Sequence, residues 1–149
     1  MGFKERYKKF NEKSYIDLIV YLVVSIVIFY YHWENFYLKY IAIITSILGF
    51  IIWITGRIQL GDSFQLGAEA KNLVISGIYS KIRHPIYFGG FLVMVGWVLY
   101  TFDTYLFIFL LFLIIIYIIL QIKRIRNEEM ILKNKYKSKY TKYKDNTLF

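Results

Sequence analysis

Four long apolar segments, each close to the length of a membrane-crossing helix, restrict the folds open to this chain. They run approximately over residues 16–31, 37–55, 86–102 and 104–122. A helix needs roughly 20 apolar residues to cross a hydrocarbon core of ~30 Å. The links HWEN and FDT are so short that each joins two antiparallel helices. We therefore predict an all-α integral membrane protein with four transmembrane helices in one domain, residues 1–149.

The composition agrees with a protein that uses the bilayer as its solvent. Hydrophobic residues make up 58% of the chain and aromatic residues 21%, against about 45–50% apolar residues in a soluble domain. A soluble core of 149 residues could not bury so many large side chains. The chain has no cysteine, which excludes disulfides and thiolate metal ligands, and we predict no metal site.

The net charge of +9 is distributed unevenly along the chain. All of the 19 basic residues except Lys39 lie before the first apolar segment, near or within the loop after the second, or after the fourth. Because basic residues accumulate in cytoplasmic loops, both termini are predicted to be cytoplasmic. The charge also favours anionic membrane lipids as partners, and we expect no nucleic-acid partner. The expected location is the cell membrane of a prokaryote, with the active site facing the cytoplasm.

The loop between the second and third segments is about thirty residues long, far longer than a simple connection requires. Long ordered loops usually have a function. Its glycines, Gly61, Gly67 and Gly77, permit tight turns. Residues 72–76 form a short apolar run that suits an extended segment, whose backbone groups would be free to hold a ligand.

The loop ends in the sequence RHPIYFGG, which contains the single proline of the chain, Pro85. Proline fits the first turn of a helix and disfavours helical geometry in the residue before it. The third span is therefore predicted to begin at Pro85. Its free N–H groups, together with Arg83 and His84, would form an anion-binding site at the membrane surface. The alternative is that His84 is an interfacial histidine without a ligand.

A second polar cluster, KRIRNEEMIL, follows the fourth span directly. If the helix continues, Arg124 and Glu128 lie one turn apart on one face, and Arg126 and Glu129 on an adjacent face. The alternative is an ordinary salt-bridged helix end. Together the two clusters supply an anion site and two carboxylates, so a zwitterionic ligand that also carries ribose hydroxyls would satisfy both.

Three tyrosines recur at helical spacing in the lysine-rich tail: Tyr136, Tyr140 and Tyr143. This spacing predicts an amphipathic C-terminal helix on the cytoplasmic membrane surface. The alternative is a tail that only improves solubility.

The segment LGDSFQLGAEAKNLVISGIYSKIRHPIYFGG, followed one span later by RNEEMILKNKYKSKYTKY, resembles the isoprenylcysteine carboxyl methyltransferase and phospholipid methyltransferase family. These integral-membrane enzymes use S-adenosylmethionine. The motif positions that carry the resemblance are Leu73, Val74, Gly77, Tyr79, Arg83, His84, Pro85, Tyr87, Gly89, Glu128, Glu129, Leu132, Tyr136, Tyr140 and Tyr143.

The resemblance implies that this chain transfers a methyl group from S-adenosylmethionine to a lipophilic acceptor, such as a prenylcysteine carboxylate or a lipid amine. The acceptor would enter from the bilayer between the spans, in a gap lined by aromatic residues including Trp97. Arg124 would orient a carboxylate acceptor, and Glu129 would accept a proton from an amine. The cofactor-binding residues implied are Lys71, Leu73, Gly77, Tyr79, Arg83, His84, Pro85, Tyr87, Gly89 and Glu128.

Two other functions are compatible with parts of the sequence. Membrane sterol and enone reductases, which use a nicotinamide cofactor, also carry an Arg-His-Pro motif, typically followed by Asn-Tyr-x-Gly-Glu. Here Ile86 replaces the asparagine and Gly90 the glutamate. A non-enzymatic four-helix membrane protein is the second alternative, but it leaves the long loop unexplained.

Overall fold

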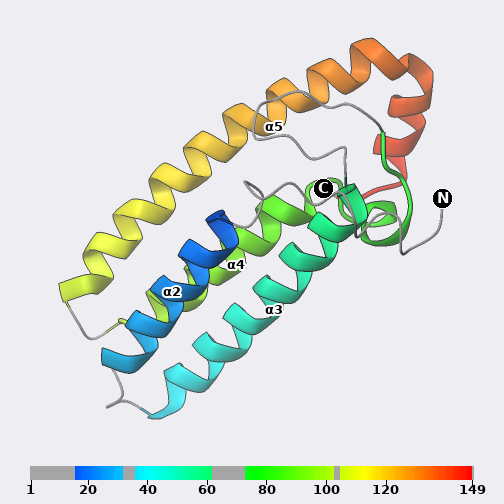
Figure 1. The fold of residues 1–149 in the computed structure, drawn as a ribbon. Helices are drawn as coiled ribbons and strands as arrows, with labels where there is room; N and C mark the ends of the chain where they lie inside the picture. Colours follow the sequence, from blue (N-terminus) through cyan, green and yellow to red (C-terminus); the bar gives the residue numbers. More distant parts are fainter. Residues whose placement is uncertain (1–15, 32–35, 62–72, 103–104, 149) are drawn as a thin grey trace.

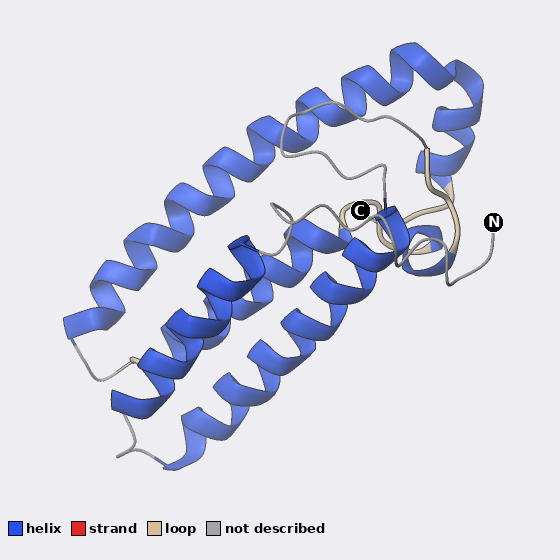
Figure 2. Ribbon diagram, viewed as in Figure 1, coloured by secondary structure: helices blue, strands red, loops and turns tan. Residues whose placement is uncertain are grey.

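The computed structural model describes residues 16–31, 36–61, 73–102 and 105–148, which form four long helices and one short 3-10 helix (Figure 1). No strand is present among these residues, and Figure 2 shows helices joined by loops. The elements in chain order are α2 (Ile16–Tyr31), α3 (Phe36–Leu60), η3 (Gly77–Ser80), α4 (Pro85–Tyr100) and α5 (Tyr105–Asp145). The predicted all-α class is therefore confirmed for the part of the chain that the structure describes.

The helices begin close to the predicted positions, but two of them end later. α3 continues to Leu60, so that Arg57 lies in its last turn rather than in the loop. α5 joins the predicted fourth span and the predicted C-terminal helix into one element of 41 residues. α3 and α5 are long and apolar enough to cross a membrane, whereas α2 and α4, with 16 residues each, are shorter apolar helices.

The core lies where α3 and α4 pack tightly against each other. Gly49 of α3 faces Gly89 of α4, and a Cβ at Gly49 would lie 2.7 Å from the Gly89 carbonyl oxygen. A Cβ at Gly89 would lie 2.6 Å from the Trp53 backbone nitrogen. Small residues let helix backbones approach closely in a bilayer, where packing contacts drive helix association. The glycines therefore set the separation between these two helices.

Helix α2 is joined to α4 through polar side chains. Trp97 donates its indole N–H to the Ser25 hydroxyl at 2.9 Å, and the Tyr100 hydroxyl donates to the Phe29 carbonyl oxygen at 2.8 Å. Trp97 is only 6% exposed and belongs to the core. Trp97, which was expected to line a gap for the acceptor, is not among the lining residues of the cavity described below, and its role towards an acceptor stays a prediction.

An ion pair with a buried arginine and a partly exposed aspartate connects the first turn of α2 to the last turn of α3. Arg57 is 3% exposed and donates two hydrogen bonds of 2.8 Å to the Asp17 carboxylate. Its guanidinium also lies 5.7 Å from the Trp53 ring centroid. Burial of this cation requires a partner, because an unpaired charge in a low-dielectric interior is costly.

Helix α5 contains a break at Lys137, where the backbone leaves helical geometry (φ 46°, ψ −119°). After this break the chain turns back towards η3, as the red segment in Figure 1 shows. Tyr140 is 2% exposed, and Tyr136 and Tyr143 bond to residues of the loop region. The predicted tyrosine face is confirmed, and it packs on the protein.

Candidate functional site

The start of α4 presents the Arg-His-Pro motif as predicted. Pro85 is the first helical residue, and His84 precedes it in a non-helical conformation (φ −125°, ψ 58°). Before it, Gly77 begins η3 with a positive φ of 63°, a geometry that other residues rarely adopt. The Ile78 N–H donates to the Gln59 side chain at 2.7 Å, which ties the loop to the end of α3.

A cavity of about 400 Å³ lies between α4 and α5, within the size range of small-molecule sites. One end is polar and contains side chains from the Arg-His-Pro motif and from the Glu-Glu motif. The remainder is aliphatic and aromatic. The lining residues are Arg83, His84, Tyr87, Phe88, Phe91, Tyr117, Ile118, Gln121, Ile122, Ile125 and Glu129.

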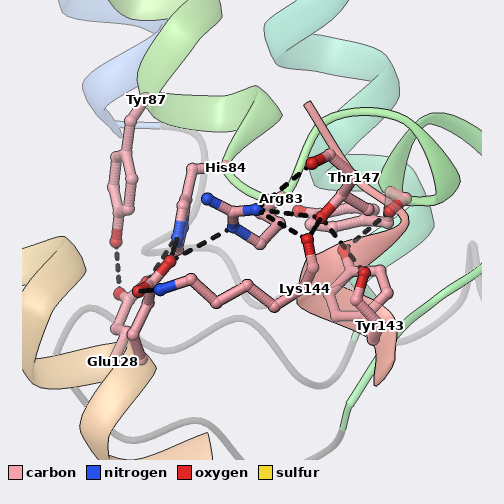
Figure 3. Close-up of polar contacts among 9 residues, drawn as sticks. Arg83, His84, Tyr87, Glu128, Tyr143, Lys144 and Thr147 are labelled. Carbon is pink, nitrogen blue, oxygen red and sulfur yellow. Dashed lines mark hydrogen bonds and ion pairs between the residues drawn. The ribbon is translucent and has the colours of Figure 1, made fainter. Parts of the chain in front are cut away.

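The Glu129 carboxylate is the acceptor at the centre of the polar end. It accepts hydrogen bonds from Arg83 Nε at 3.2 Å and from Lys144 Nζ at 2.8 Å. Its Oε1 atom also lies 3.4 Å from His84 Nε2. Figure 3 shows these groups converging from α4, α5 and the C-terminal residues. Two motifs separated by one span are thus joined directly by hydrogen bonds and ion pairs.

The Glu128 carboxylate belongs to a second, adjacent set of contacts. The Tyr87 hydroxyl donates to it, Arg124 Nε lies 3.5 Å away, and His84 Nδ1 lies 3.8 Å away. The Arg124 guanidinium also lies 5.3 Å from the Tyr87 ring centroid. The predicted Arg124–Glu128 pair on one helix face is confirmed. In the described part of the chain, neither side chain is among the cavity-lining residues.

Burial and neighbouring charges shift the pKa values of His84, Glu128 and Glu129, which lie beyond the apolar part of the helices. Burial lowers the pKa of His84 below its ordinary 6.5, against the opposing effect of Glu129. Burial raises the pKa of Glu128, which Tyr87 and Arg124 partly offset. Burial also acts to raise the pKa of Glu129, but its bond to Lys144 and its contact with His84 outweigh this, so that the net pKa is lowered.

These shifts predict a specific pH dependence of stability. The folded chain binds fewer protons at His84 than the unfolded chain, so stability should fall as the pH drops below about 6.5. The charged groups that face this imidazole are Glu128, Glu129, Arg83 and Lys144. Thermal unfolding in detergent between about pH 7.5 and 5.5 should show a smaller loss of melting temperature in His84→Gln than in the wild type. Parallel curves for the two proteins would contradict this assignment.

The remaining predicted cofactor-binding residues that the structure describes bond to or pack against other parts of the chain. The Leu73 N–H donates to the Tyr136 hydroxyl at 3.3 Å, and the Tyr79 carbonyl accepts the Tyr143 hydroxyl at 2.6 Å. Residues 73–75 have no regular secondary structure and Ser76 has an extended backbone, while residue 72 lies outside the described residues. The Leu73 N–H, which was expected to be free to hold a ligand, is bonded to Tyr136 within the chain. Gly89 packs against α3 and Pro85 adjoins Gly56. Lys71 lies outside the described residues.

Gln121 is a site residue that the sequence reasoning missed. Its side-chain oxygen is buried and has no hydrogen-bond partner among the residues that the structure describes, and the residue lines the cavity. The sequence contains a signal for it: Gln121, Ile125 and Glu129 follow one another at intervals of four residues and so share a helix face. Helical spacing alone does not separate the two carboxylates, because Glu128 lies seven residues after Gln121 and Glu129 eight.

The lining residues suit a zwitterionic ligand that lies beside an apolar one. The Glu129 carboxylate suits a cationic group, and Arg83 with His84 at the start of α4 suits a carboxylate. The unpaired Gln121 oxygen can accept a hydrogen bond from an amino or hydroxyl group. The aliphatic remainder of the cavity leaves room for an apolar acceptor.

Comparison with known proteins identifies the family. A search of curated proteins found no significant match, and a search of solved structures found none. The model of the family described as phospholipid methyltransferase matches residues 37–139, more than half of the chain. The matched region contains both motifs and the span between them. The chain therefore belongs to the phospholipid methyltransferase family, a branch of the integral-membrane methyltransferases that include the isoprenylcysteine carboxyl methyltransferases.

Proposed function

We propose that this chain is an S-adenosylmethionine-dependent methyltransferase that methylates a lipophilic acceptor held in the bilayer. The observation that carries the proposal is the two-part cavity, in which Arg83, His84 and Glu129 lie at one end and apolar side chains line the rest. A zwitterionic cofactor matches the polar end, and a lipid chain matches the apolar end. Four spans, cytoplasmic termini and a location in a prokaryotic cell membrane complete the proposal.

The geometry supports distinct roles for the two glutamates. Glu129 lines the cavity, so we assign it to the cationic part of the cofactor, and its position also allows it to take a proton from an amine acceptor. Glu128 holds the Tyr87 hydroxyl, and Arg124 contacts both. Glu128 and Arg124 would therefore act as positioning residues for Tyr87, whose ring stacks near His84 with centroids 5.8 Å apart.

The chemistry places a limited demand on the protein. S-adenosylmethionine, when bound, supplies a methyl group on a sulfonium, which is already a good leaving group. The protein then has to align the acceptor with the methyl carbon and exclude water. Tyr87 and Tyr117 are suited to this task because both rings line the cavity, and the Tyr117 hydroxyl is fixed by the Tyr87 carbonyl at 3.0 Å. The acceptor can be a prenylcysteine carboxylate or a lipid amine.

Calorimetry on the protein purified in detergent tests the proposal directly. We expect saturable binding of S-adenosylmethionine, followed by transfer of labelled methyl groups into a lipid extract. His84→Ala should weaken binding, because it removes a group at the polar end of the cavity. Binding of reduced nicotinamide cofactor without binding of S-adenosylmethionine would instead support the reductase alternative.

A further inference from the structure

The residues after the break at Lys137 form a strap, residues 138–148, that contacts Arg83 and Glu129 at the polar end of the cavity. Tyr143 bonds to the η3 backbone through its hydroxyl, and the Leu148 N–H donates to the Lys81 carbonyl at 2.9 Å. Figure 3 shows Lys144 extending from this strap towards the carboxylates of α5. The strap is thus anchored on the residues that directly precede the Arg-His-Pro motif.

The strap uses the two charged groups that a zwitterionic ligand would need. Arg83 Nη1 donates to the Lys144 carbonyl oxygen at 3.2 Å, to the Thr147 carbonyl oxygen at 3.4 Å and to the Thr147 hydroxyl at 3.0 Å. Lys144 Nζ donates to Glu129 Oε2 at 2.8 Å. The Glu129 carboxylate, which lines the cavity, is therefore already paired with the Lys144 ammonium. The Arg83 guanidinium is already bonded to oxygens of the strap.

We propose that this strap is a latch that competes with the cofactor. The Lys144 ammonium binds Glu129 where the cationic group of the cofactor would bind. The oxygens of residues 144 and 147 bind Arg83 where the carboxylate of the cofactor would bind. The inference rests on the proposed function, because it assumes that S-adenosylmethionine is the ligand. Cofactor binding then releases the strap, and cofactor departure lets it close again.

A different role for the strap leads to opposite results. If it were a lid that gains contacts with the bound cofactor, loss of the Lys144 ammonium would weaken binding and the cofactor would hold the strap in place. Lys144 is 48% exposed at its side chain, so the ion pair with Glu129 is partly solvated. A competing ion pair of this kind makes only a modest contribution, which sets the size of the expected effect.

Calorimetric binding of S-adenosylmethionine to three proteins distinguishes these roles. Lys144→Met should bind it about two- to five-fold more tightly than the wild type, since the lost ion pair is partly exposed. Lys142→Met is the matched control, because this exposed lysine lies two residues away in the same strap, and its affinity should stay at the wild-type value. Equal or weaker binding by Lys144→Met overturns the latch. Absence of binding in all three proteins contradicts the proposed function, and with it the latch.

Limited trypsin digestion of the wild-type protein is a second test of whether the cofactor releases the strap. Lys139 and Lys142 are exposed residues of the strap. Released from Arg83 and Glu129, the strap should be cut faster at these positions when S-adenosylmethionine is added. Cleavage after Lys123 and Arg126, in the continuous part of α5, is the internal control and should not change. Slower cleavage of the strap with the cofactor present would show a lid rather than a latch.

Discussion

Replacing Glu129 by glutamine is expected to weaken S-adenosylmethionine binding by about 10- to 150-fold. The estimate follows from the ~1.5–3 kcal/mol contributed by a hydrogen bond to a charged group. Glu129 is the carboxylate that lines the cavity, and glutamine retains its shape while removing its charge. The substitution also removes the negative charge that Arg83, His84 and Lys144 share, although the amide oxygen can still accept a hydrogen bond. Calorimetry in detergent would measure the loss.

Two control variants make this result specific. Asp145→Asn removes one negative charge at an exposed position near the end of α5 and should leave the affinity unchanged. Glu128→Gln should weaken binding less than Glu129→Gln, because Glu128 acts through Tyr87. A larger loss in Glu128→Gln would restore the assignment suggested by the resemblance alone, in which Glu128 binds the cofactor and Glu129 is reserved for catalysis.

The sequence predicted the helices well where a local signal was present. Pro85 marks the start of α4 because proline is tolerated in the first turn and restricts the residue before it. The end of α3 was placed too early because Arg57 reads as a loop residue by its charge. Its partner, Asp17, is 40 positions away, and no local pattern indicates that the two lie together.

The candidate site, too, was predictable only where a local sequence pattern indicates a contact. The Arg124–Glu128 pair follows from helical spacing, and the polar end of the cavity follows from the two motifs. The contact between Lys144 and Glu129 depends on the reversal of the chain at Lys137. Lysine is not a residue that marks a turn with positive φ, so nothing in the local sequence indicates that the tail returns to the cavity.

The apolar part of the cavity is the feature that separates binding of the cofactor from binding of the acceptor. Phe91 lies nearly two turns into α4, and Ile118 and Ile122 face it from α5. Large apolar side chains on the outer face of α5, such as Ile108 and Phe112, are more than half exposed and suit contact with lipid. An acceptor with a hydrocarbon chain can therefore reach the cavity without leaving an apolar environment.

Filling this apolar part should strongly reduce methyl transfer while leaving cofactor binding intact. In Ile118→Trp the larger ring would occupy the space assigned to the acceptor, and we expect the rate to fall on the order of 10²-fold, as when a reactant is displaced by about 1 Å. Ile119→Trp is the matched control, because Ile119 is 50% exposed and is not among the lining residues. Transfer of labelled methyl groups into lipid extract and calorimetric binding of S-adenosylmethionine would be measured on both. Equal loss of transfer in the two variants, or loss of cofactor binding in Ile118→Trp alone, would show that the acceptor does not bind between α4 and α5 as we infer.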